Sequence, residues 1–63
     1  MSGEYREEIH VGSIVEIVEK KNQPTGKLTK GEVSRILTKK DFHSRGIKVQ
    51  LKTGEIGRVQ KIL

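Results

Sequence analysis

The residues best suited to chemistry lie in segment 39–45, where four basic side chains surround one aromatic ring: Lys39, Lys40, His43 and Arg45 around Phe42. Cations neutralise phosphate and an exposed ring stacks on a base, so this composition is typical of loops that bind single-stranded RNA. The alternative is that Phe42 packs at one end of the hydrophobic core. We favour packing, because a lone large apolar residue is usually buried.

A second basic segment, residues 20–30, gathers four lysines around a Thr-Gly pair: Lys20, Lys21, Lys27 and Lys30 around Thr25-Gly26. Backbone amides of a glycine turn, together with lysines, form a phosphate-binding concavity in many proteins. The segment is not a Walker A loop, because it lacks the upstream glycine at the required spacing. The alternative is a solvated polar loop that covers the domain.

A third set of cations follows two predicted strands near the end of the chain: Lys48, Lys52, Arg58 and Lys61. Basic residues on neighbouring strands form a stripe that follows a phosphate backbone. Lysines on exposed strands also protect a sheet edge from aggregation. The sequence leaves these two interpretations open.

No pattern in the sequence is typical of a catalytic or metal site. His10 and His43 lie in different segments, and there is no cysteine for a zinc site or a disulfide. Glu16 and Glu19 have opposite parity in a predicted strand, so they cannot form a close carboxylate pair. We therefore expect a protein that is not an enzyme and that holds no metal and no cofactor.

Charge is divided unevenly along the chain. Residues 1–19 carry five glutamates against one arginine, which gives −4, and residues 20–63 carry twelve basic against three acidic residues, which gives +9. The basic body of the domain favours a polyanionic partner, although a net charge of this size also serves solubility.

The composition also indicates the cellular compartment. The absence of cysteine fits a reducing environment. No apolar run approaches the ~20 residues of a membrane span, and MSGEYREEIH lacks the apolar stretch of a signal peptide. We expect a cytoplasmic protein without a membrane anchor, monomeric by default.

The apolar residues indicate an all-β fold. Thirteen of the 20 are Val or Ile and there is no Ala, and β-branched side chains favour pleated sheets. The apolar stretches 9–19, 31–38, 46–52 and 55–60 are predicted strands. Segments 14–18 and 33–37 also fit a helical face, but runs this short and rich in β-branched residues favour strands.

The last two strands are predicted in most detail. Ile47, Val49 and Leu51 alternate with polar residues, which predicts a half-buried strand. Thr53-Gly54 then predicts a tight hairpin turn. We expect Ile56 to point inward on the returning strand, and residues 61–63 to add two more apolar side chains.

The chain is long enough for one domain only. We divide it into a flexible acidic segment, residues 1–8, and a single β-barrel domain, residues 9–63. A barrel is preferred over a sandwich, because it needs less chain and leaves few open edges.

Two resemblances sharpen this expectation. The pattern Val15-x-Ile17 … Gly26 … Gly31-Glu32-Val33-x-x-Ile36 resembles a KOW motif, the first hairpin of small Src-homology-3-like (SH3-like) barrels in ribosomal and transcription proteins. The resemblance implies a five-stranded SH3-like barrel. In it, the glycine before the second strand allows close backbone approach and strong bending.

The chain also resembles the YwbE family of small uncharacterised microbial proteins, over roughly residues 9–63. The carrying residues are Lys20-Lys21, Gln23, the run TGKLTKG over 25–31, Ile36-Leu37-Thr38, GIKV over 46–49, Leu51, Gly54 and Gly57-Arg58-Val59. Asn22, Pro24 and Ser44-Arg45 depart from the family pattern, and all of them lie in loops. The resemblance implies the fold and no activity.

The sequence thus predicts a small non-enzymatic RNA-binding module that uses basic loops. The alternative is a module that binds an acidic protein partner. The predicted contacts are Lys27, Lys30, Lys39, Lys40, Phe42, His43, Arg45, Lys48 and Arg58.

Overall fold

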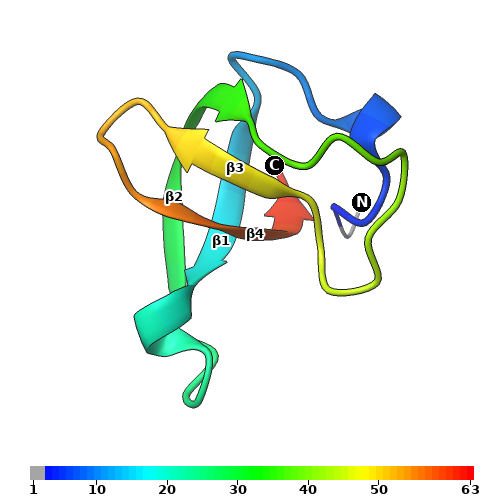
Figure 1. Ribbon diagram of the computed structural model, residues 1–63. Coiled ribbons are helices and arrows are strands. Elements are labelled where there is room, and N and C mark those ends of the chain that lie inside the picture. Colours follow the sequence, from blue (N-terminus) through cyan, green and yellow to red (C-terminus); the bar gives the residue numbers. More distant parts are fainter. Residues whose placement is uncertain (1–2) are drawn as a thin grey trace.

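The computed structural model describes residues 3–63 and shows four antiparallel strands closed into a barrel in the order β1-β2-β3-β4 (Figure 1). The strands are β1 Ile14–Glu19, β2 Leu28–Ile36, β3 Lys48–Leu51 and β4 Ile56–Ile62. Two short 3-10 turns accompany them, η1 Arg6–Glu8 and η2 Lys20–Asn22. The all-β prediction is confirmed, and both ambiguous segments are strands.

The prediction of five strands is wrong for the described residues. The ring is closed by β4, which pairs with β3 along one edge and with β1 along the other. Pairing of Val15 with Ile62 and of Glu19 with Gly57 uses the whole length of β1, so no edge remains for a fifth strand. Register shifts at Glu16/Ile17 and Val33/Arg35 bend the sheet, because bulges increase local twist.

Eight apolar side chains fill the barrel: Ile9, Val15, Ile17, Val33, Ile47, Val49, Leu51 and Val59. Alternation along each strand places them inward, and no polar or charged residue among residues 3–63 is buried. Most of the small core is thus built from β-branched residues, which pack well on a pleated surface.

The β3–β4 hairpin forms as predicted, but with a different register. Leu51 N–H donates to the carbonyl of Glu55 at 2.8 Å, so three residues rather than two form the loop. Because side chains alternate with a period of two, one extra loop residue reverses every side chain on the returning strand. Ile56 is therefore exposed, and the prediction that it points inward is wrong; Gly57 and Val59 face the core instead.

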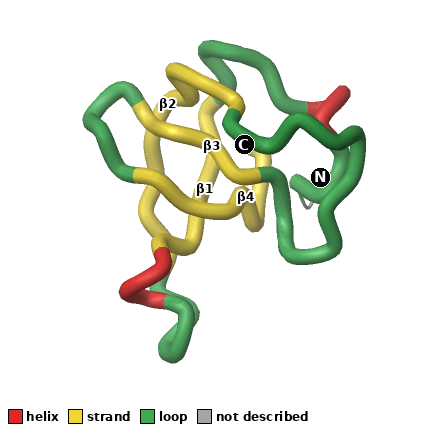
Figure 2. The backbone as a smooth tube through the Cα atoms, in the orientation of Figure 1, coloured by secondary structure: helices red, strands yellow, loops and turns green. Residues whose placement is uncertain are grey.

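The leading segment lies along the loop that joins β2 to β3 (Figure 2). The carbonyl of Gly3 accepts a hydrogen bond from Ile47 N–H at 2.8 Å, and that of Glu4 from His43 N–H at 2.9 Å. Arg6 N–H donates to the carbonyl of Asp41 at 2.8 Å. Residues 1–2 of the segment expected to be flexible lie outside the described residues.

Candidate nucleic-acid interface

Tyr5 and Phe42 form an aromatic pair on the surface of the molecule. They face each other in an isolated antiparallel bridge, with ring centroids 5.0 Å apart and an interplanar angle of 53°. Tyr5 is 49% and Phe42 45% exposed. The interpretation of Phe42 as part of the core is therefore wrong, because the eight side chains that fill the barrel do not include it.

His43 lies among cations from the same loop and from β4. Partial desolvation, followed by the positive charges of Arg58, Arg45 and Lys40, lowers the pKa of His43 below its ordinary value of 6.5. The backbone N–H of Arg45 donates to Nδ1 of His43 at 3.1 Å. This hydrogen bond assigns the ring proton to Nε2, so the neutral imidazole presents a donor.

This lowered pKa predicts that the folded state becomes less stable in mild acid. Below 6.5 the unfolded chain takes up a proton on His43 that the folded state resists, so stability should fall as the pH drops from about 7 toward 5. Urea unfolding at several pH values measures this fall, and His43→Gln should reduce it. An equal fall in His43→Gln and His10→Gln would assign the effect to other groups.

Arg58 is held in place and extends the cationic group onto the barrel wall. Its Nη1 donates to the carbonyl of Gly46 at 3.2 Å, which leaves its other N–H groups for a ligand. On β3, Lys48 stands directly opposite Arg58 in the antiparallel register. Two strands and one loop therefore bring together Lys40, His43, Arg45, Lys48 and Arg58, which we call the basic face.

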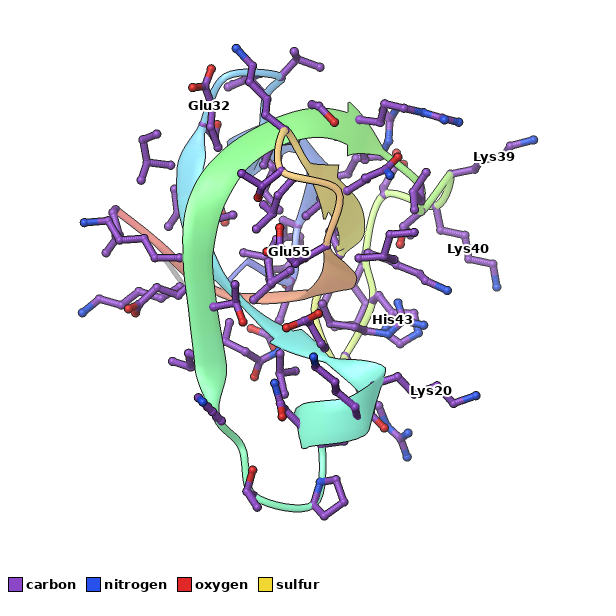
Figure 3. All side chains as sticks on the ribbon, turned by 90° about the vertical axis from the view of Figure 1, so that its left-hand side faces the viewer. Lys20, Glu32, Lys39, Lys40, His43 and Glu55 are labelled. Carbon is purple, nitrogen blue, oxygen red and sulfur yellow. The ribbon has the colours of Figure 1, made fainter. Side chains whose placement is uncertain are left out.

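Lys39 precedes Lys40 in the loop and extends this basic face. In Figure 3 the side chains of Lys39, Lys40 and His43 project from one edge of the molecule, and Lys20 projects from the same edge in that view. Figure 1 shows that η2, which carries Lys20, lies at the opposite end of the barrel from this loop. All three lysines are exposed. The sequence prediction that segment 39–45 presents its cations together is thus consistent with the structure.

Other predicted cations lie elsewhere. Lys30 stands beside Glu16 in the β1–β2 register, and Lys61 flanks the same glutamate from β4. Lys52 forms an ion pair with Glu32 at 2.6 Å. Acidic neighbours therefore offset the charge of these three lysines, and the predicted single stripe is divided.

The phosphate-binding turn predicted at Thr25-Gly26 does not present its amides. The N–H groups of Thr25 and Gly26 both donate to the carbonyl of Asn22, at 3.2 and 2.7 Å. The N–H of Lys27 donates to the Thr25 hydroxyl at 3.4 Å. With these donors used inside the turn, Lys27 contributes only its side-chain charge.

Five residues beside the basic face were absent from the sequence prediction: Tyr5, Val18, Gln23, Leu28 and Gln60. Tyr5 packs against Phe42. The other four line two adjoining shallow hollows, one of which Arg45 and Arg58 also line. Only Tyr5 carried a signal in the sequence, as the one aromatic residue of a polar segment. The others are brought together by strand register.

Two further searches cover residues 3–63. No group of three or more His, Asp or Glu side chains in this range is arranged to hold a metal ion. None of the helices in the same range has the length and hydropathy that crossing a membrane requires.

Comparison with known proteins gives two findings. Residues 2–62 match the model of a family described as an uncharacterized conserved protein, DUF2196. The uncharacterized protein YwbE of Bacillus subtilis (strain 168) is 54% identical over 63 residues, which cover 100% of this chain and 97% of YwbE. No solved structure matches the chain significantly. The resemblance predicted from the TGKLTKG, GIKV and GRV runs is confirmed.

Proposed function

Because the chain belongs to the DUF2196 family, whose description names no activity, we propose its function from its surface: it binds nucleic acid, most readily single-stranded RNA. The ligand lies on the basic face, with its phosphates on the cations and a base against the Tyr5–Phe42 pair. This is a binding role and not a catalytic one.

The observation that carries the proposal is the position of the aromatic pair beside the basic face. Phe42 and His43 are consecutive, and two half-exposed rings next to a group of cations form the combination that binds single strands. Paired bases cannot stack on such rings, whereas unpaired bases present their faces. Duplexes would therefore use only the charges.

We also infer that the barrel is of the SH3-like type. Strand β2 pairs with β1 through residues 28–32 and with β3 through residues 33–36, as one strand shared by two halves of a bent sheet. At Gly31 an added Cβ would lie 2.6 Å from Cδ1 of Leu51. The Leu51 side chain thus packs directly on the backbone at Gly31, and this supports a structural need for glycine at the position that the KOW resemblance singles out.

The test is a titration of the labelled protein with single-stranded RNA, duplex RNA and single-stranded DNA at two salt concentrations. We expect dissociation constants of about 1–100 μM, with log K for single strands falling by about 0.7 per phosphate neutralised as log salt rises. Single-stranded RNA should bind most tightly. No binding at low salt would overturn the proposal, and a search for an acidic protein partner of the same cations would follow.

A further inference from the structure

A continuous shallow hollow adjoins the basic face on the outside of the barrel. One part, of about 280 Å³, is lined by Val18, Gln23, Arg45, Arg58 and Gln60. The next part, of about 370 Å³, shares Val18, Gln23 and Gln60 and reaches Leu28. The first volume lies just below the lower limit of about 300 Å³ for small-ligand sites, and the second lies just above that limit.

Strand register explains the floor of this hollow. Val18 of β1 stands opposite Leu28 of β2 on one side and opposite Arg58 of β4 on the other. Arg58 in turn stands opposite Lys48 of β3. An outward row thus crosses all four strands, and it changes from two apolar side chains to two cations.

Two glutamines, Gln23 and Gln60, line both parts of the hollow beside this row. Nε2 of Gln60 donates to the carbonyl of Arg45 at 2.9 Å, which fixes the amide and leaves Oε1 without a donor among the described residues. The amide of Gln23 forms no hydrogen bond within the same part of the chain and is exposed. Together they offer acceptors and donors to a planar group.

This set of groups matches the chemistry of a nucleotide. Side-chain amides hydrogen-bond the edges of bases, and single-stranded RNA is recognised through bases that are splayed out and held on such edges. Apolar side chains contact the face of a base, and guanidinium groups bind phosphate bidentately. The hollow supplies all three kinds of group: apolar side chains from Val18 and Leu28, amides from Gln23 and Gln60, and guanidinium groups from Arg45 and Arg58.

We propose that the hollow between Val18, Leu28, Gln23 and Gln60 holds one unpaired nucleobase, whose adjacent phosphate lies on Arg45 and Arg58. This inference rests on the proposed function and deepens it, because it makes the ligand a single strand and gives one base a defined position.

A matched pair of neutral double variants tests the proposal. Gln23→Ala with Leu28→Ala removes one amide and one aliphatic side chain from the hollow. Gln50→Ala with Ile56→Ala removes the same two kinds of group from the β3–β4 hairpin, where they stand opposite each other. Leu28 is 42% and Ile56 43% exposed, so both variants should fold as the parent does, which thermal unfolding checks.

The readout is the affinity for a ten-nucleotide single-stranded RNA and for duplex RNA. The Gln23/Leu28 variant should lose about tenfold for the single strand, in line with the value of a base-edge contact, and nothing for the duplex. The Gln50/Ile56 variant should match the parent in both. Equal single-strand affinity in all three proteins would overturn the nucleobase site and leave the proposed function standing.

A second measurement does not depend on variants. The side-chain amide signals of the three glutamines are resolved by nuclear magnetic resonance, and the single strand should shift those of Gln23 and Gln60 but not that of Gln50. Shifts confined to the basic face would overturn the site. If the parent binds no nucleic acid at all, the proposed function fails as well, so the two failures are distinguishable.

Discussion

Replacing Lys40, Arg45 and Lys48 together by alanine should lower the affinity for single-stranded RNA on the order of one hundredfold at about 50 mM salt. Each lost phosphate contact removes about 0.7 from the slope of log K against log salt, so the slope should fall by about 2. All three side chains are exposed and belong to the basic face. Fluorescence anisotropy at four salt concentrations measures both quantities.

The matched control removes three lysines that have acidic neighbours: Lys21, Lys30 and Lys61. Lys30 and Lys61 flank Glu16, and the charge of Lys21 contributes to the lowered pKa of Glu55, after hydrogen bonds from Thr53 and the backbone. Both triple variants lose the same net charge. If they weaken binding equally, the ligand responds to total charge and the basic face is not its site.

Gly46→Ala should unfold most of the protein. Gly46 has a φ of +102°, and an added Cβ would lie 2.2 Å from the carbonyl oxygen of Val59 in β4. Strain of this kind costs about 1–3 kcal/mol for the dihedral angles alone, and the overlap with backbone adds to it. A domain of this length has a free energy of unfolding of about 3–9 kcal/mol, so circular dichroism should show mainly unfolded chain.

The control for this prediction is Gly54→Ala in the β3–β4 hairpin. Gly54 has the same φ of +102°, but nothing lies within 4 Å of an added Cβ. The Gly54→Ala variant therefore measures the cost of the dihedral angles without the steric overlap. We expect its free energy of unfolding in urea to fall by about 1–2 kcal/mol. Similar losses in the two variants would mean that the 43–46 turn moves away from β4 to make room.

The β3–β4 hairpin shows which structural features a local sequence pattern can predict and which it cannot. Ile47, Val49 and Leu51 alternate with polar residues, and this period of two predicted the strand and its inward face. Such a period can be recognised from residues that are neighbours in the sequence. The face of the returning strand depends on whether the loop has two residues or three. Turn composition at Thr53-Gly54 did not decide this, so Ile56 was assigned to the wrong side.

The candidate site was predicted only in its local parts. The cations around Phe42 are neighbours in sequence, so their grouping was visible. The row from Leu28 through Val18 and Arg58 to Lys48 joins four strands through three registers. Tyr5, the partner of Phe42, belongs to the leading segment. No periodic pattern in that segment predicts that it packs against the loop. Such contacts depend on long-range pairing that a single sequence does not display.

Closure of the barrel by β1 and β4 also determines how the domain folds. These strands are the first and last of the ring, so their pairing has the longest loop closure in the fold. Topologies of such high contact order fold slowly, on a scale of about milliseconds to seconds. Until β4 docks, β1 and β3 each expose an unpaired edge to other chains. The interval before ring closure is therefore when newly made molecules are most open to aggregation.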